Sequence, residues 1–514
     1  MQTIKSPRLN RVFFSSSKMA IGLFISVLIS LTGCSSSKVA GDSEKRITTV
    51  EELREKIDER FSDPNFAHAH WGVMIQSLKT GEVWYERNSE RMFMPASNNK
   101  ILSASSALTK LGPDFTFETD LCYSGNITDS VLDGSLVVFG NGDPTLYSHF
   151  QKDPRDLFRS WANVLKSRGI KRITGNVIGD DNAFDDNTLG DGWSLDGLDA
   201  WYSAEVGPLQ LNENYVDLKI IPPALKTGAV VIEPNLPSSY YTITNNVTVS
   251  DSGRSYISAS RAYGCNNIVI KGNVVAGSRP IIESPTITNP TLFYVTVLRE
   301  VLQQEGIQVD GKPMDCDDIQ GWKHTASEFN RLDAHYSPLM KDVIKEMMKR
   351  SQNMYAEIMP RILSWKFNGQ GSFRQGKKIV EGVLEQFGIA PGTYVYADGS
   401  GLSRYNYVSP AELVSILKGM RKSPYWNAWY DAQPVAGVDG TLKGRMKGTR
   451  AEGNVHAKTG TISNVRGLSG YVTTADGEEV VFSFLVNGHL RSSQETEDIT
   501  DSVLRIIAEF DRTK

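Results

Sequence analysis

Three short patterns in the sequence hold side chains that could carry out nucleophilic catalysis. A serine and a lysine stand three residues apart at Ser97 and Lys100, within "MPASNNKILSASSAL". Ser351 and Asn353 form a second pair, and Lys458 opens a Lys-Thr-Gly tripeptide. A serine hydroxyl is a weak nucleophile at neutral pH, so it needs a base within hydrogen-bond reach, and a neutral lysine can be that base. The residue types therefore indicate acyl transfer through a serine.

Each pattern also has an ordinary structural explanation. Pro95 and the apolar periodicity after it predict a helix over 97–111, whose first turn places the serine and lysine side by side. A serine there is more often an N-cap, and a chain of this length holds roughly two Ser-x-x-Lys pairs by chance. The other two patterns could be turns. Their joint occurrence favours catalysis, because a Lys-Thr-Gly tripeptide is expected only about 0.1 times by chance.

Composition bounds the class of protein. The chain has 514 residues, 40% of them hydrophobic, which is enough for two or three domains. Its 55 basic and 59 acidic residues give a net charge of -4, so we expect no nucleic-acid partner. With no Cys-x-x-Cys pair and seven scattered histidines, the sequence predicts neither a metal site nor a cofactor.

The N-terminal segment has the pattern of a secretory signal. Basic residues precede an apolar run, Met19 to Leu31, which is too short for an ordinary membrane span. The run ends in "LTGC", which resembles the bacterial lipoprotein signal, where cleavage leaves the cysteine, here Cys34, as the lipidated first residue. The alternative is a buried cysteine that merely follows an apolar run. We expect a signal peptide over 1–33 and a polar tether over 34–45.

This signal implies a cell-envelope protein, lipid-anchored to a membrane and facing the periplasm. Ser35 follows the cysteine where an aspartate would favour retention in the inner membrane, so we expect the outer membrane. An exported chain can also form disulfides. Cys122, Cys265 and Cys316 could form one disulfide and leave one free thiol, and the sequence does not choose the pair.

Hydrophobic periodicity divides the rest of the chain into three parts. Residues 46–113 contain a helix, "TVEELREKIDERF", and a hairpin around Lys79-Thr80-Gly81. Residues 114–318 are rich in short β-branched runs such as "GSLVVFG" and "NNIVIKGNVV", and could hold two subdomains. Helical patterns return from "PTLFYVTVLREVLQQEGI", and residues 319–514 end in two strands and a helix. This order predicts an α+β domain interrupted by a β-rich insertion.

The three patterns, in this order, resemble the signature of penicillin-binding proteins and serine β-lactamases. The long β-rich block between the first two is similar to the class C low-molecular-mass penicillin-binding proteins, the D-alanyl-D-alanine carboxypeptidase/endopeptidase family. Further matching stretches are "GNGDPTL", "GNVIGDDNAF", "DGSGLSRYNYVSP" and "PVAGVDGTL". The resemblance covers nearly all of the mature chain. It implies a β-lactamase/transpeptidase-like fold, an antiparallel sheet with flanking helices beside a helical lobe.

The resemblance also implies a role for each catalytic side chain. Ser97 is the expected nucleophile and Lys100 its base, helped by the positive end of a helix and a second cation, Lys458. Ser351 is expected to relay the proton to the leaving nitrogen, and Asn353 to bind the substrate's backbone amide.

Other residues are expected to bind the substrate. The backbone N–H groups of Ser97 and Thr461 would form the oxyanion hole, and Lys458, with Thr459 and Gly460 of the same strand, would hold the terminal carboxylate. Arg404 could contact substrate or form a surface ion pair. Asp180 could meet a free amine of the stem peptide or be a turn residue.

The implied function is a serine DD-peptidase of peptidoglycan. Its substrates would be stem peptides, from which it would release terminal D-alanine or in which it would cut cross-links, and β-lactam antibiotics would acylate it. One alternative is a serine β-lactamase, for which the insertion has no obvious use. Another is a catalytically silent lipoprotein that binds the cell wall, against which stands the presence of every expected catalytic side chain.

Overall fold

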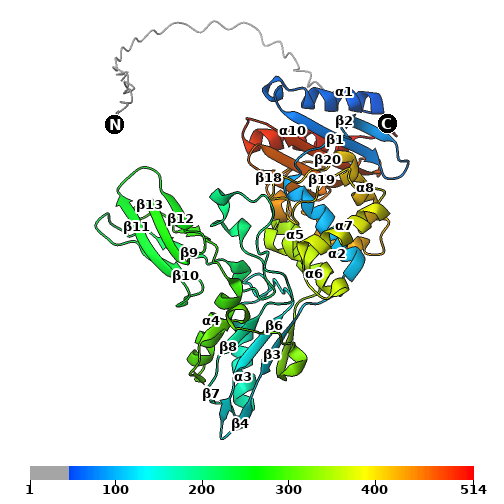
Figure 1. Ribbon diagram of the computed structural model, residues 1–514. Coiled ribbons are helices and arrows are strands. Elements are labelled where there is room, and N and C mark those ends of the chain that lie inside the picture. The colour runs from blue at the N-terminus through cyan, green and yellow to red at the C-terminus, as the bar shows by residue number, and fades with distance from the viewer. Residues whose placement is uncertain (1–45, 514) are drawn as a thin grey trace, which may run out of the picture. The chain divides into compact units, whose positions relative to one another are not determined.

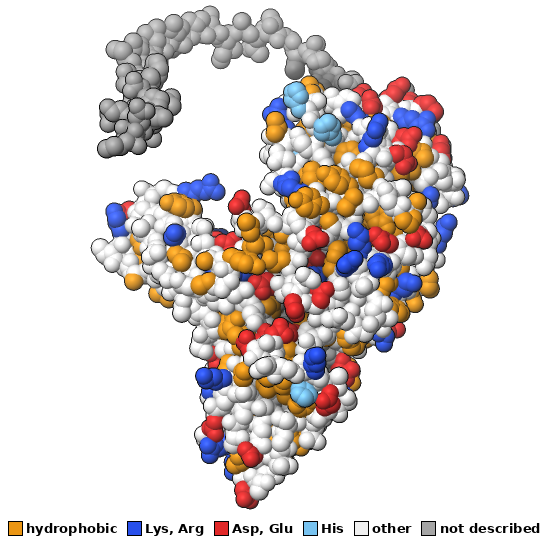
Figure 2. Space-filling view, in the orientation of Figure 1, with side chains coloured by type: hydrophobic (Ala, Val, Ile, Leu, Met, Phe, Trp, Pro, Cys, Tyr) orange, Lys and Arg blue, Asp and Glu red, His pale blue; other side chains and the backbone are white. Residues whose placement is uncertain are grey.

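The computed structural model describes residues 46–513 (Figure 1). The predicted signal peptide, tether and Cys34 therefore lie outside the described residues. Within the described part, no helix has both the length and the apolar character needed to cross a membrane. Acidic and basic side chains are interspersed on the face shown in Figure 2.

A five-stranded antiparallel sheet organises the first and last parts of the chain. Its strand order is β18-β19-β20-β1-β2, so strands from the two ends of the chain pair in one sheet. Val73 of β1, for example, lies opposite Phe484 of β20. The strands are β1 (His70–Ser77), β2 (Val83–Arg87), β18 (His456–Ile462), β19 (Val465–Thr473) and β20 (Glu479–Asn487). The predicted hairpin is β1 and β2.

Helices cover both faces of this sheet (Figure 1). On one face, α1 (Val50–Phe61) and α10 (Ser493–Glu509) pack against the strands around Leu53 and Leu504. On the other lie α2 (Lys100–Leu111) and α8 (Pro410–Arg421), together with the helices of the helical lobe. Those are α5 (Met340–Arg350), α6 (Asn353–Asn368), α7 (Phe373–Gln386) and α9 (Trp426–Ala432). The predicted antiparallel sheet with flanking helices and a helical lobe is thus present.

The helix predicted over 97–111 begins with a tighter turn. A 3-10 turn, η2 (Ala96–Asn99), precedes α2, and Ala96 has a left-handed φ of 47°. Ser97 lies inside this turn, and the residue at the N-cap position is Pro95. The N-cap alternative for Ser97 is therefore wrong, because its hydroxyl does not cap a helix.

The insertion begins and ends on paired strands. β3 (Glu118–Tyr123) leaves the helical lobe and β17 (Asn330–Tyr336) returns to it, with Glu118 opposite Tyr336. They share the sheet β16-β8-β6-β3-β17, with β6 (Leu136–Gly140), β8 (Val177–Asp180) and β16 (Pro313–Asp315). The predicted end of the insertion at residue 318 therefore falls before its last strand. The insertion extends to β17, because that strand completes the hydrogen bonding of β3.

The rest of the insertion is built from smaller sheets and two helices. α3 (Asp156–Ser167) and α4 (Pro290–Gln304) share a core with several strands. The strand prediction missed α3, although Phe158, Trp161 and Leu165 form an apolar face at helical spacing. The remaining strands are β4 (Asn126–Thr128), β5 (Val131–Asp133), β7 (Arg172–Ile173), β9 (Leu218–Ile221), β10 (Val231–Pro234), β11 (Thr242–Ser250), β12 (Tyr256–Arg261), β13 (Asn267–Val275), β14 (Ile281–Glu283) and β15 (Gln308–Val309).

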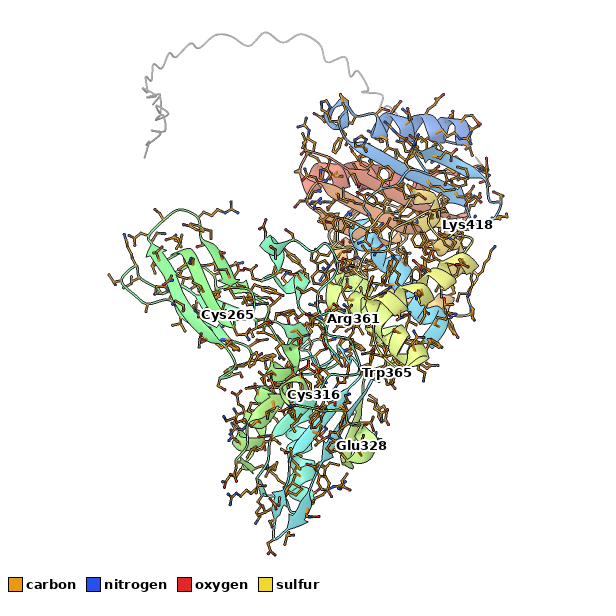
Figure 3. The ribbon with its side chains drawn as sticks, viewed as in Figure 1. Cys265, Cys316, Glu328, Arg361, Trp365 and Lys418 are labelled. Atoms are coloured by element: carbon orange, nitrogen blue, oxygen red, sulfur yellow. The ribbon has the colours of Figure 1, made fainter. Side chains whose placement is uncertain are left out.

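The expected disulfide is wrong for the described cysteines. Cys122, Cys265 and Cys316 are all free thiols. Cys122 is buried in β3. Cys265 is exposed shortly before β13, and Cys316 is buried directly after β16 (Figure 3). None of these three cysteines is therefore joined to another by a disulfide.

Candidate active site

The three sequence patterns meet at one cavity of about 830 Å³. The turn before α2 supplies Ser97, the break between α5 and α6 supplies Ser351 and Asn353, and the edge strand β18 supplies Thr459 and Thr461. Hydrogen bonds join the first two patterns through Lys100 and the last two through Lys458. Residues spread over most of the chain therefore form one site.

Lys100 is fully buried against the predicted nucleophile. Its Nζ lies 3.0 Å from Ser97 Oγ and donates to Asn353 Oδ1 at 2.6 Å. A third hydrogen bond goes to the carbonyl oxygen of Ser400 at 2.9 Å. The amino group of Lys100 is thus held in place by three acceptors, one of which is the hydroxyl of the serine that the neutral amine would deprotonate.

The environment of the two lysines disfavours their charged forms. Burial lowers the pKa of Lys100 to about 7, although the carboxylates of Asp398 and Glu357 oppose this shift. Burial also lowers the pKa of Lys458 well below its ordinary value, and the charge of Lys100 lowers it further. Burial, and not a second cation or a helix end, is therefore the main cause at Lys100. Because a charge on Lys100 disfavours a charge on Lys458, the pair does not readily hold two charges.

Ser351 is held in an uncommon backbone conformation. It caps the C-terminus of α5 with φ 62° and ψ 36°, in the left-handed region. Its Oγ accepts a hydrogen bond from Lys458 Nζ at 2.8 Å. The same Nζ also donates to the carbonyl oxygen of Thr459 at 2.8 Å. This geometry connects Ser351 to the lysine of the third pattern.

Gly460 allows β18 to lie directly against the turn that carries Ser97. A Cβ atom at this position would lie 2.6 Å from the carbonyl oxygen of Pro95 and 3.0 Å from Asn98 Oδ1. Any larger residue would push the strand away from the turn. The glycine of the tripeptide is thus explained by close packing of two backbones, which brings Thr461 to the cavity beside Ser97.

The insertion forms part of the cavity wall. Asn353 Nδ2 donates to the carbonyl oxygen of Tyr202 at 2.7 Å, and the side chains of Trp193, Trp201 and Tyr202 line the cavity. If Asn353 binds the substrate's backbone amide as expected, its side-chain hydrogen bond to the Tyr202 carbonyl must break. Sequence reasoning missed these aromatic residues. The sequence feature that could have identified them is the presence of large aromatic residues in a stretch otherwise rich in Gly, Ser and Asp, "GDGWSLDGLDAWYS".

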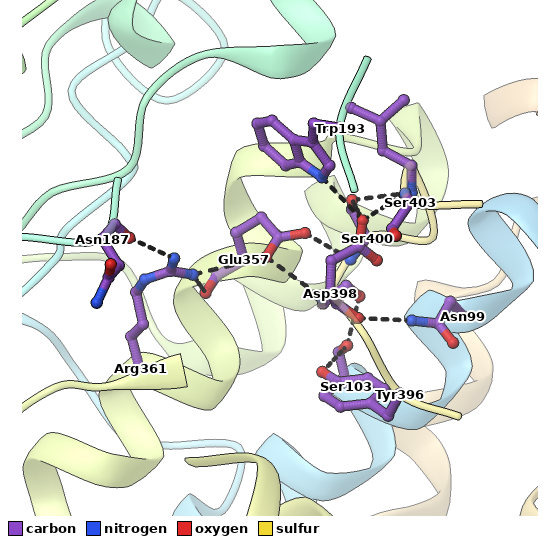
Figure 4. A network of polar contacts seen from close by, with 12 residues as sticks. Asn99, Ser103, Asn187, Trp193, Glu357, Arg361, Tyr396, Asp398, Ser400 and Ser403 are labelled. Atoms are coloured by element: carbon purple, nitrogen blue, oxygen red, sulfur yellow. Dashed lines mark hydrogen bonds and ion pairs between the residues drawn. The ribbon is translucent and has the colours of Figure 1, made fainter. Parts of the chain in front are cut away.

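A buried polar network holds the loop whose Ser400 carbonyl accepts a hydrogen bond from Lys100. Figure 4 shows this network around Glu357, Arg361 and Asp398. Glu357 accepts the backbone N–H groups of Ser400 and Gly399 at 2.8 and 3.1 Å, and so fixes the loop whose carbonyl contacts Lys100. Arg361 forms an ion pair with Glu357 at 3.5 Å and donates to the carbonyl of Asn187 in the insertion. Asp398 accepts from Trp193 Nε1 at 2.9 Å and from the Gly401 N–H at 2.7 Å. The network therefore ties the loop, the helical lobe and the insertion together.

Two polar residues extend the site along β18. Thr459 Oγ1 donates to Thr441 Oγ1 at 2.7 Å, and Thr441 comes from the "PVAGVDGTL" stretch. Arg404 is exposed, lines the cavity and donates to the carbonyl oxygen of Ser463 at 3.1 Å. Arg404 is thus positioned to meet a ligand.

Asp180 is not part of this cavity. It ends β8, is buried, and accepts hydrogen bonds from Trp322 Nε1 at 2.6 Å and from the N–H of Asn182 at 3.1 Å. Both carboxylate oxygens are engaged within the insertion, and the carboxylate does not line the cavity. The expectation that Asp180 meets a substrate amine is therefore corrected.

The structure also brings together ligating side chains that the sequence pattern did not suggest. Asp181, Asp315, Cys316 and Asp317 offer atoms within 4.8 Å of one another. Hydrogen bonds within the insertion already engage two of the carboxylates, Asp181 with Thr291 and Asp315 with Asn289. The group was missed because Asp181 is remote in sequence from the other three residues.

Known proteins resemble this chain over almost its whole length. A D-alanyl-D-alanine carboxypeptidase from Actinomadura sp. (strain R39) is 30% identical over 498 residues, covering 92% of this chain and 87% of that protein. The carboxypeptidase DacB of Haemophilus influenzae is 29% identical over 85% of this chain and 92% of its own length. A crystal structure of penicillin binding protein 4 (dacB) from Haemophilus influenzae matches with a TM-score of 0.75 at 27% identity, covering 90% of this chain and all of that one.

The same protein has also been solved in complex with a novel β-lactam, and that structure matches with a TM-score of 0.70 at 25% identity. It covers 88% of this chain and 99% of its own. The family match runs over residues 53–510, which include all three patterns and the insertion. The chain therefore belongs to the D-Ala-D-Ala carboxypeptidase 3 (S13) family.

Proposed function

We propose that this protein is a serine DD-peptidase of peptidoglycan that is acylated on Ser97 by stem peptides and by β-lactams. The observation that carries the proposal is the contact between Ser97 Oγ and Lys100 Nζ at 3.0 Å, with burial lowering the pKa of the lysine to about 7. A lysine with this pKa can accept a proton near neutral pH. Membership of the family and the relatives' carboxypeptidase activity support the assignment.

Acylation begins when neutral Lys100 accepts the hydroxyl proton of Ser97 as Oγ attacks the penultimate D-alanine carbonyl carbon. The carbonyl oxygen becomes an oxyanion, for which the N–H groups of Ser97 and Thr461 are the donors. Ser351 then passes its hydroxyl proton to the leaving nitrogen as the C–N bond breaks, and Lys458, which donates to Ser351 Oγ, replaces that proton. The proton taken up by Lys100 keeps the total charge of the two lysines unchanged. Terminal D-alanine departs, and water later hydrolyses the ester to regenerate Ser97.

The terminal carboxylate selects the substrate. Thr459 of β18 lines the cavity, and Lys458 is buried next to it in the same strand, so a hydroxyl and a cation are available to hold a carboxylate. A bound carboxylate beside Lys458 favours its charged form, so binding the substrate restores the charge that burial disfavours. The two lysines then differ in charge. Lys458 is charged when the substrate is bound, whereas Lys100 must be neutral to act as the base.

Labelling with fluorescent penicillin tests the nucleophile. The parent protein should carry one covalent label for each molecule, and Ser97→Ala should carry none, since no other hydroxyl lies beside Lys100 in the same way. Lys110→Ala, an exposed-helix-end substitution on the same α2, serves as the control and should label like the parent. Labelling that persists in Ser97→Ala would remove Ser97 from the mechanism, and rapid release of the label would indicate a β-lactamase.

Mass spectrometry of muropeptides separates two modes of DD-peptidase action. Loss of one alanine from pentapeptides indicates carboxypeptidase activity, which the relatives' names support. Conversion of cross-linked dimers to monomers would add endopeptidase activity. No change with the parent protein, under conditions where penicillin still labels it, would contradict the proposed substrate.

We also propose that Cys34 is lipidated and that the protein is an envelope lipoprotein with its catalytic part in the periplasm. The support is the charged and apolar N-terminal segment that ends in "LTGC". The outer membrane is the proposed location because Ser35, and not aspartate, follows the cysteine.

A further inference from the structure

Three consecutive residues of the insertion have a left-handed backbone, and the middle one contacts the two residues on either side of Ser351. Asn212, Glu213 and Asn214 have φ values of 51°, 54° and 56°, and residues other than glycine rarely adopt this backbone conformation. Such strain persists only where surrounding contacts enforce it, and it often marks a functional position.

Side-chain hydrogen bonds enforce this turn on both sides. Asn212 Nδ2 donates to the carbonyl of Tyr215 at 2.8 Å. Asn214 Nδ2 donates to Gln210 Oε1 at 2.7 Å and to the carbonyl of Glu205 at 2.8 Å. Together they fix the middle residue, Glu213, whose side chain is buried and points into the helical lobe.

The Glu213 carboxylate contacts both residues that flank Ser351. Its Oε1 forms an ion pair with Arg350 Nη1 at 3.1 Å, and its Oε2 accepts a hydrogen bond from Gln352 Nε2. Oε2 also accepts from Tyr215 OH at 2.8 Å. Gln352 in turn caps α6, since its Oε1 accepts the N–H of Asn353 at 2.8 Å.

We infer that Glu213 is a positioning residue for the Ser351-Gln352-Asn353 pattern, through which the insertion holds Ser351 in its left-handed conformation. Ser351 has φ 62°, so its position depends on what holds its two neighbours. One carboxylate holds both, and it reaches Asn353 through Gln352. The inference rests on the proposed acylation of Ser97, in which Ser351 relays the proton.

The arrangement also explains why a charge is buried here. A buried carboxylate is costly unless its oxygens are paired, and Glu213 has a cation, an amide and a hydroxyl as partners. An apolar residue could fill the space but could not bind Arg350 and Gln352 at once. Arg350 also pairs with Glu346 at 2.8 Å, so loss of the Glu213 charge does not leave the arginine without a partner.

The test measures two quantities for each variant and for the parent protein: the rate of acylation and the fraction of molecules labelled at the end. With saturating penicillin, Glu213→Gln should acylate roughly 10- to 100-fold more slowly, because a displaced Ser351 transfers its proton less well. The labelled fraction at the end should equal that of the parent. A purely structural defect would behave in the opposite way, since an unfolded fraction lowers the labelled fraction and not the rate of the folded molecules.

Two further variants keep the test decisive. Gln352→Met removes the amide that links Glu213 to Asn353 and should show the same slowing. Asp120→Asn removes a carboxylate that pairs with Arg331 at 2.7 Å in the sheet of the insertion, and should acylate at the parental rate. Rates within twofold of the parent for both Glu213→Gln and Gln352→Met, or a loss only in the labelled fraction, would overturn the inference. Absence of acylation in the parent would instead contradict the proposed function.

Discussion

At the scale of single residues, the site depends on two buried lysines with different neighbours. Lys100 contacts the hydroxyl of Ser97, an amide oxygen and a backbone carbonyl. Lys458 contacts Ser351 and lies on β18, the strand proposed above to hold the substrate's carboxylate. Because the charge of one disfavours the charge of the other, a division into base and cation is physically consistent.

Arginine substitutions should separate the two lysines. Lys100→Arg keeps a positive charge but cannot lose it at working pH, so acylation should fall by roughly 100-fold or more. Lys458→Arg keeps the charge that binds a carboxylate and should retain partial activity, whereas Lys458→Ala should not. Stopped-flow acylation with a chromogenic β-lactam measures both rates. Equal losses in the two arginine variants would contradict the division.

The pH dependence of acylation should show an ascending limb. Burial lowers the pKa of Lys100 to about 7, and only its neutral form can accept the serine proton. The rate should therefore rise as pH increases through neutrality and then level off. The midpoint of the parent profile should lie near pH 7, where the buried lysine loses its proton. A rate independent of pH across this range would exclude a titrating lysine base.

At the scale of elements, catalysis depends on how closely the edge strand β18 packs on the turn before α2. Gly460 is the contact point, since its Cα faces the Pro95 carbonyl. This packing places Thr461 and Ser97 on the same cavity. The helix break at Ser351 then completes the site from the opposite side.

Gly460→Ala should damage both stability and catalysis. The added Cβ would lie 2.6 Å from a backbone oxygen, so either the strand or the turn must move. Overpacking of this kind costs about 1–3 kcal/mol, and a displaced Thr461 should slow acylation as well. Gly444→Ala is the matched control, because nothing lies within 4 Å of a Cβ at that position. Thermal unfolding and acylation rates report the two effects, and parental values for Gly460→Ala would show that the contact is unimportant.

At the scale of the whole molecule, the insertion and the catalytic domain share one site. Tyr202 accepts a hydrogen bond from Asn353, and Arg361 and Glu213 add two polar connections between the parts. The insertion thus forms one wall of the cavity. The paired strands β3 and β17 connect it to the helical lobe.

The proposed anchor belongs to this scale because it determines where the whole chain acts. Cys34→Ser should prevent lipidation and move the protein from the membrane to the soluble fraction, because the lipid on this cysteine is the proposed anchor. Cys265→Ser, which changes an exposed free thiol, should leave the protein in the membrane fraction. Fractionation followed by immunoblotting measures both. A Cys34→Ser protein that stays with the membrane would point to a different anchor.

Much of this organisation could be predicted from the sequence because it depends on local signals. Helical periodicity around Lys100 and β-branched runs in the insertion identified most elements, and the three catalytic patterns identified Ser97, Ser351 and Lys458. Helix α3 was missed because its neighbours are strands. Asp180 was misplaced because a short acidic stretch does not reveal which carboxylate faces a cavity.

The sequence alone determined the residue types, their order and the class of chemistry, because a serine with a lysine one helical turn away requires only local geometry. The tertiary structure decided what those residues contact. Three features depend on residues that are distant in the chain. They are the burial that lowers the pKa of Lys100, the contact of Lys458 with Ser351, and the contacts of Glu213 with both neighbours of Ser351. Such contacts depend on the packing of several elements at once, and no local pattern encodes that packing.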